Sequence, residues 1–229
     1  EKQVGISETT IGGRRELSNA NGYFDITNLS VLALERGATA REAIQVMGEL
    51  GETYGYKDGG EMLAVADTEE AWIFEMIGPG PLWTQGDDAP GAFWVAQRIP
   101  DGCIGGSANA PMIDVFDPED TENFMCAPGI KEYAIEQGWY DPASGEEFSW
   151  REHFMNVNKP ETSGRRVWRV FTLAAPSLVG EIDEADLPVY VKPDQKLSID
   201  DINAIQRDHY EDTEFDGRNS ITAGPWNNP

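Results

Sequence analysis

Residues 62–77, MLAVADTEEAWIFEMI, contain two short apolar runs separated by four polar residues. Each run has the length and apolar content of a strand buried in a sheet, and the polar residues at 67–70 are numerous enough to form a turn. We therefore predict a β-hairpin with strands over residues 62–66 and 71–77.

Further strands are predicted on both sides of this hairpin. Residues 4–11 and 93–99 have strand-like sequences, and residues 104–108 follow shortly afterwards. Pro100-Asp101-Gly102 separates the last two segments with residues that favour turns. The first 110 residues therefore read mainly as strands.

Helical sequence begins at Thr39, where Glu42 three residues later completes a capping box, and the helix is predicted to stop at Gly55. Beyond residue 110 the main helical candidates are residues 130–137, 148–157, 166–175 and 199–210, the last capped by Ser198 with Asp201. Strands followed by helices predict an α+β fold rather than a doubly wound parallel sheet. We expect a single domain over residues 1–229, with one helix in 1–110 and mainly helices and long loops in 111–229.

The chain is strongly acidic. It has 229 residues, with 41 Asp and Glu against 17 Lys and Arg, and a formal net charge of −24. Such a charge repels nucleic-acid phosphates and anionic lipid surfaces, and no apolar run approaches the roughly 20 residues that span a bilayer. We therefore expect no nucleic-acid partner and no membrane partner.

Motifs for cofactors and metals are missing from the sequence. There is no phosphate-binding glycine loop, dinucleotide fingerprint or His-Glu-x-x-His motif. The acidic clusters at 117–122 and 181–186 lack the spacing of a calcium loop and are interpreted as solvated acid. We expect neither a cofactor nor a bound metal.

Histidine and cysteine are scarce. His153 and His209 lie on predicted helices among charged neighbours, which favours structural or solvated roles over catalysis. Cys103 and Cys126 match no zinc or redox spacing. Two interpretations are equally favoured: the cysteines form one disulfide, or they are two small buried side chains. A histidine-based triad within this chain is disfavoured.

Several short motifs occur in the order found in the dipeptidase A family, which the chain resembles over nearly its whole length. They are VGISETT at 4–10, the hairpin at 62–78 with EAW at 70–72, WVAQR at 94–98, SANA at 107–110, NFM at 123–125, RVW at 166–168 and GPW at 224–226. That family is related to the secernins and belongs to the N-terminal-nucleophile cysteine hydrolases, with a more distant similarity to penicillin V acylases and bile-salt hydrolases.

The resemblance implies an αββα sandwich, incomplete at both ends because family members are longer. It implies a cysteine-type amide hydrolase, most simply a dipeptidase acting on dipeptides or short peptides, whose amino-terminal cysteine nucleophile lies ahead of Glu1. No nucleophile is expected within this chain. Two alternatives remain: an acylase of N-acyl amides or lactams, and a non-catalytic binding or structural protein of the same fold.

Supporting groups carry over residue by residue. Asn109 matches an asparagine that faces the nucleophile and donates to the oxyanion, and Arg166 matches an arginine that holds the thiolate or a carboxylate. Glu8, Thr9 and Thr10 are predicted to contact substrate, and the alternative for Glu8 and Thr9 is that they order the end of the strand. The competing interpretations are an Asn that merely ends a strand in a turn, and arginines at 165, 166 and 169 that merely pair with surface acids.

The expected partner is a small peptide substrate. The sequence is also compatible with a homo-oligomer or with association of fragments from the same precursor. The acidic surface and the habit of the family favour a secreted or periplasmic location, with a cytoplasmic one as the alternative.

Overall fold

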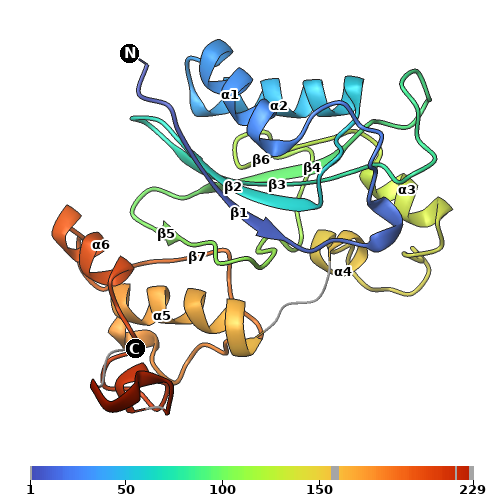
Figure 1. Cartoon of the computed structure of the whole chain (residues 1–229). Helices are drawn as coiled ribbons and strands as arrows, with labels where there is room; N and C mark the ends of the chain where they lie inside the picture. Colours follow the sequence, from blue (N-terminus) through green and yellow to red (C-terminus); the bar gives the residue numbers. More distant parts are fainter. Residues whose placement is uncertain (1, 156–159, 220, 227–229) are drawn as a thin grey trace.

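A five-stranded antiparallel sheet forms the centre of the fold in the computed structural model, which describes residues 2–155, 160–219 and 221–226 (Figure 1). Its strands, in spatial order, are β1 (Gly5–Ile11), β2 (Gly60–Ala66), β3 (Ala71–Ile77), β4 (Phe93–Ile99) and β6 (Phe124–Cys126). The predicted hairpin is confirmed as β2 and β3. Its turn is closed by the Asp67 carboxylate, which accepts from the backbone N–H groups of Glu69 and Glu70.

A second, two-stranded sheet pairs β5 (Ile104–Gly105) with β7 (Tyr190–Val191). The helices are α1 (Ile26–Arg36), α2 (Ala40–Tyr54), α3 (Ile130–Glu136), α4 (Trp150–Phe154), α5 (Arg165–Ala174) and α6 (Ile199–Gln206). Shorter helical turns cover Arg15–Leu17, Pro160–Gly164, Pro176–Leu178, Gly217–Asn219 and Ile221–Trp226. In Figure 1, α1 and α2 lie on one side of the large sheet, whereas β5, β7 and α5 lie on the other.

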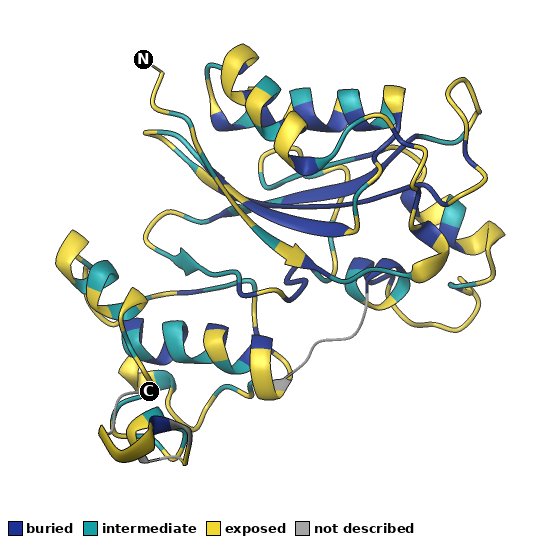
Figure 2. Cartoon of the chain, viewed as in Figure 1, coloured by how far each residue is buried: buried dark blue, intermediate teal, exposed yellow. Residues whose placement is uncertain are grey.

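Close contacts at two neighbouring glycines define the order of these layers. A Cβ atom at Gly105 would lie 2.9 Å from the Ile99 side chain, so β5 packs directly on the large sheet. A Cβ atom at Gly106 would lie 3.8 Å from both Phe171 and Val167, which places α5 behind the small sheet. The layers therefore run helix, sheet, sheet, helix, and the predicted α+β class is confirmed. Figure 2 shows the deepest burial along the central strands.

Contact between α2 and the sheet depends on Gly48. A Cβ atom there would lie 2.4 Å from the indole ring of Trp94. That ring is 2% exposed, and its Nε1 donates to Glu52 Oε1 at 2.6 Å, so it has little room to move.

We expect Gly48→Ala to destabilise the fold by about 1–3 kcal/mol, the usual effect of overpacking, although Gly→Ala inside a helix normally stabilises. Thermal or denaturant unfolding measures the change. Gly59→Ala is the control, because nothing lies within 4 Å of a Cβ atom there. Equal stability of Gly48→Ala and the parent chain would show that α2 does not pack this closely.

Three elements were not anticipated in the sequence: α1, β6 and the short strand β7. α1 lies in a part of the chain for which only one helix was expected; the Asp25 side chain caps it by accepting from Asn28 N at 2.8 Å. β6 belongs to the portion expected to be mainly helical, yet it pairs with β4 in the large sheet. The division into a strand half and a helix half is therefore too simple.

The ends of several predicted elements also move. The strand expected at 104–108 is regular only over β5, and the helix expected at 148–157 is α4, with residues 156 and 157 outside the described part of the chain. α6 has the predicted capping box of Ser198 and Asp201 but ends at Gln206. It stops early because Asp208 is held by Arg169 and Tyr210 takes a left-handed backbone, φ 63°.

None of the helices in the described ranges is both long and apolar enough to span a membrane.

Candidate active site

Asn109 sits at the end of the segment that runs on from β5. Its backbone is left-handed, φ 61°, a conformation that asparagine tolerates better than most residues. Its neighbours Ala108 and Ala110 are buried whereas Asn109 is exposed, so the turn presents this side chain outward. The amide Nδ2 donates to the backbone carbonyl of Thr10 at 2.7 Å. Because a side-chain amide has two N–H donors, one remains for a ligand.

Arg166, in the first turn of α5, fixes the orientation of that amide. Its Nη1 and Nη2 each donate to Asn109 Oδ1 at 3.2 Å, and Nη2 also donates to the Ala108 carbonyl at 2.7 Å. With Oδ1 facing the guanidinium, Nδ2 must face Thr10. The positive charge on the oxygen side of the amide also polarises it and strengthens Nδ2 as a donor.

The end of β1 supplies the other side of the site. Side chains alternate along a strand, so Thr9 faces the small sheet, where its hydroxyl hydrogen-bonds to that of Ser107. Thr10 and Glu8 face the opposite way, toward the helices, and Thr10 Oγ1 donates to Glu8 Oε1 at 3.3 Å. Of the residues predicted from sequence, the structure therefore brings together Asn109, Arg166 and the backbone of Thr10. Thr9 lies on the same face, and the Glu8 side chain lies on the other.

Comparison with known proteins gives one family. The family described as Peptidase family C69 matches residues 1–228. The chain belongs to peptidase family C69. The resemblance seen in the sequence is thereby confirmed.

Relatives of this C69 chain have dipeptidase names. A "Probable dipeptidase" of Latilactobacillus sakei is 29% identical over 94% of this chain and 44% of the relative. Another, of Salmonella dublin, is 30% identical over 93% of this chain and 48% of the relative. "Dipeptidase A" of Lactobacillus helveticus is 29% identical over 78% of this chain and 35% of the relative. The chain thus spans less than half the length of these relatives.

The other two arginines of α5 have acidic partners, as the sequence had indicated for at least one of them. Arg165 Nε donates to Glu184 at 2.9 Å, and Arg169 Nη2 donates to Asp208 at 2.6 Å. Arg166 forms no ion pair with any residue in the part of the chain that the structure describes. Its guanidinium donates instead to uncharged groups: Asn109, the Ala108 and Thr162 carbonyls and the Ser163 hydroxyl.

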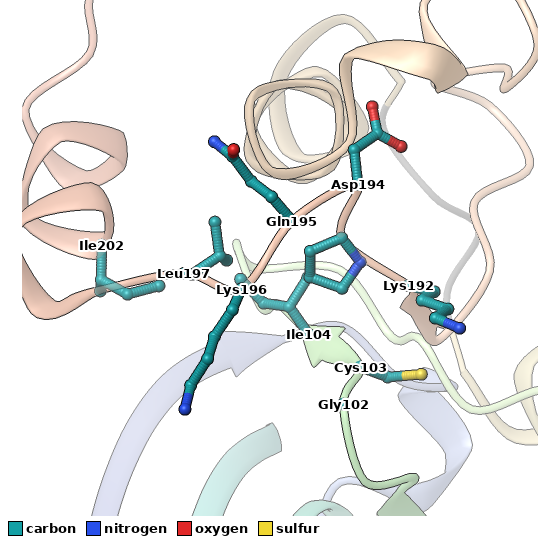
Figure 3. A pocket seen from close by; sticks show the side chains of 10 residues that line it. Gly102, Cys103, Ile104, Lys192, Asp194, Gln195, Lys196, Leu197 and Ile202 are labelled. Atoms are coloured by element: carbon teal, nitrogen blue, oxygen red, sulfur yellow. The ribbon is translucent and has the colours of Figure 1, made fainter.

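Neither cysteine is placed as a nucleophile for this site. Both are unpaired, which excludes the disulfide interpretation. Burial raises the pKa of Cys126 to about 11, so its thiol stays protonated at neutral pH. Cys103 lines a cavity of about 630 Å³ beside β5, together with Lys192, Lys196 and Ile202 (Figure 3), and a smaller cavity that extends to Ser107.

Both histidines have structural partners. His153 stacks on Phe148, and its Nδ1 lies 2.6 Å from the Ser149 carbonyl. His209 lies 3.8 Å from Glu211. The structural or solvated roles favoured by the sequence fit these contacts.

Sequence reasoning missed two residues around the site. Ser107 belongs to the SANA motif, but its contact with Thr9 depends on how the two sheets face each other. Glu75 was also overlooked, although a single carboxylate inside the apolar run AWIFEMI is a visible signal. It is fully buried and accepts hydrogen bonds from the segment just beyond Asn109.

Proposed function

We propose that this C69 chain supplies the amide-binding part of a dipeptidase active site. The observation that carries the proposal is the Asn109 amide, exposed on a left-handed turn and oriented by a guanidinium that has no carboxylate partner among the described residues. Such a preorganised donor is suited to an oxyanion that forms on a carbonyl under attack. The dipeptidase names of the relatives support dipeptides or short peptides as substrates.

In the proposed reaction a cysteine thiolate attacks the peptide carbonyl carbon, and the carbonyl oxygen becomes an oxyanion that accepts from Asn109 Nδ2. Collapse of this intermediate breaks the C–N bond, and the leaving amine takes a proton from the α-ammonium group of the same cysteine. Water then attacks the thioester, releases the acid and restores the thiol. Arg166 keeps the amide turned toward the oxyanion.

We assign the nucleophile to an amino-terminal cysteine outside this chain. Neither Cys103 nor Cys126 has a free α-amino group, and the Cys126 thiol resists ionisation. This assignment extends the resemblance to N-terminal-nucleophile hydrolases.

The test uses the full-length polypeptide that contains this chain, purified after any natural processing. Amine release from a panel of dipeptides, N-acyl amino acids and a lactam measures the activity, and the alkylated residue is identified by mass spectrometry after iodoacetamide treatment. We expect dipeptide hydrolysis that is lost on alkylation of an amino-terminal cysteine. Turnover that survives complete alkylation would overturn the cysteine mechanism, preferential cleavage of acyl amides would favour the acylase alternative, and no turnover of any amide would favour a binding protein.

A further inference from the structure

Glu75 is a charged residue in the middle of the apolar strand β3, and it is fully buried. Alternation along the strand puts it on the same face as Ile73, whose side chain contacts β5 near Gly105. It therefore points away from the α1 and α2 layer and toward the active-site side of the sheet. Burying a carboxylate is costly unless several donors satisfy it, which raises the question of what this one holds.

Three donors converge on the Glu75 carboxylate. Oε1 accepts from the backbone N–H groups of Met112 at 2.5 Å and Ile113 at 3.1 Å. Oε2 accepts from the indole Nε1 of Trp150 at 2.9 Å. Glu75 therefore fastens the segment that begins three residues after Asn109 both to the central sheet and to α4.

The same helix also holds the chain that leaves β1. The backbone N–H of Arg14 donates to the Phe154 carbonyl at 2.9 Å, and Gly13 pairs with Met155 in an isolated bridge. The two segments that meet at the hydrogen bond from Asn109 to Thr10 are thus both tied to α4. The hydrogen bond between Trp150 and Glu75 connects α4, and through it both segments, to β3 of the large sheet.

Asn109 needs a support on each side because its left-handed backbone and exposed side chain provide little packing of their own. Arg166 is the support before it, through the Ala108 carbonyl. Beyond it, the first side-chain acceptor for the backbone is the Glu75 carboxylate, at Met112.

We propose that Glu75 is a positioning residue for the amide donor of Asn109, an inference that rests on the proposed function. It acts through the backbone N–H groups of Met112 and Ile113, and it takes no part in proton transfer because it is fully buried with both oxygens already accepting. A shift of the amide by about 1 Å is enough to lower turnover strongly.

The test is a double-mutant cycle in the active full-length enzyme. Glu75→Gln keeps an oxygen for the two backbone donors but presents an NH2 group to the Trp150 indole N–H, so the segment must move. We expect kcat to fall by about tenfold to a hundredfold with KM nearly unchanged. In an Asn109→Ala background the same change should have no further effect, because the donor it positions is gone.

Glu52→Gln is the matched control. Glu52 also accepts from an indole N–H, that of Trp94, but on the α2 side of the sheet. We expect kcat to be unaffected there. A Glu75→Gln loss of the same size with and without Asn109 would overturn the proposal, as would an equal loss in Glu52→Gln.

Trp150→Phe keeps the inference testable if Glu75→Gln fails to fold. It removes one donor and leaves the carboxylate on its two backbone partners, so a smaller fall in kcat is expected, again absent without Asn109. If Asn109→Ala itself leaves kcat unchanged, the proposed function fails; if Asn109→Ala is slow but both Glu75 and Trp150 variants act independently of it, only the positioning role fails.

Discussion

Asn109→Ala is expected to lower kcat by about 10²–10³-fold, the effect of removing one oxyanion donor. KM should change little, because in the proposed reaction the amide binds charge that develops only in the transition state. Steady-state kinetics of dipeptide hydrolysis by the full-length enzyme measure both constants. The structure predicts this size of effect because the donor is fixed in advance by Arg166 and by the Thr10 carbonyl.

Two further variants separate the amide from the backbone at this position. Asn109→Gly removes the side chain while readily accepting φ 61°, so it should be as slow as Asn109→Ala without the strain. Asn109→Asp keeps the shape and can accept from Arg166 but has no N–H donor, so it should also be slow. Asn21→Ala, at another exposed turn, is the control and should be unchanged. Full turnover in Asn109→Gly would remove the side-chain amide from the mechanism.

The central hairpin could be predicted because its information is local. The strands β3 and β4 have the predicted bounds, since apolar runs bounded by turn residues specify buried strands without reference to the rest of the chain. α1 could have been found as well: Ile26, Leu29 and Ala33 are its buried residues and follow helical spacing. β6, with three residues, is too short to have a pattern of its own and exists only because β4 offers an edge.

The site could be predicted only in part, for a similar reason. The identities of Asn109 and Arg166 followed from motifs, but their contact joins residues 57 positions apart and depends on α5 packing behind the small sheet. The strand register then decides that Thr9 and Thr10 face opposite sides, so Thr10 contributes its carbonyl rather than its hydroxyl. Glu75 acts through the backbone N–H groups of Met112 and Ile113, and a contact with backbone groups cannot be predicted from a side-chain motif.

Stability is expected to fall as the pH rises from 5 to 8. Burial raises the pKa of Glu75 from its ordinary value of 4.5 to about 7, against the opposing effect of its hydrogen bonds from Met112, Ile113 and Trp150 and the charge of Arg151. Between these two values the folded state binds a proton that the unfolded state has lost, so the free energy of unfolding decreases as pH rises. This loss of stability is on the order of 3 kcal/mol, and it is complete once the pH passes about 7.

Ionisation of Glu61 also lowers the free energy of unfolding as the pH rises, over a wider pH range. Burial, followed by the hydrogen bond and charge of Glu8 and the charge of Asp58, raises its pKa to about 9. A plot of thermal stability against pH from 5 to 9 should therefore fall steeply up to about pH 7 and less steeply from there to about pH 9. Glu75→Gln should flatten the profile below pH 7 only, whereas Glu61→Gln should flatten it above pH 7 as well. Glu119→Gln, at an exposed carboxylate, should leave the profile unchanged.

As the pH falls below 7, stability should then increase while turnover decreases. A protonated Glu75 is more favourable in the folded protein, but without its negative charge it is a weaker acceptor for the three donors that hold the segment after Asn109. Acid therefore stabilises the sheet while loosening the support of the amide donor. An unfolding profile in Glu75→Gln with the parent's full slope between pH 5 and 7 would contradict the titration on which this opposition depends.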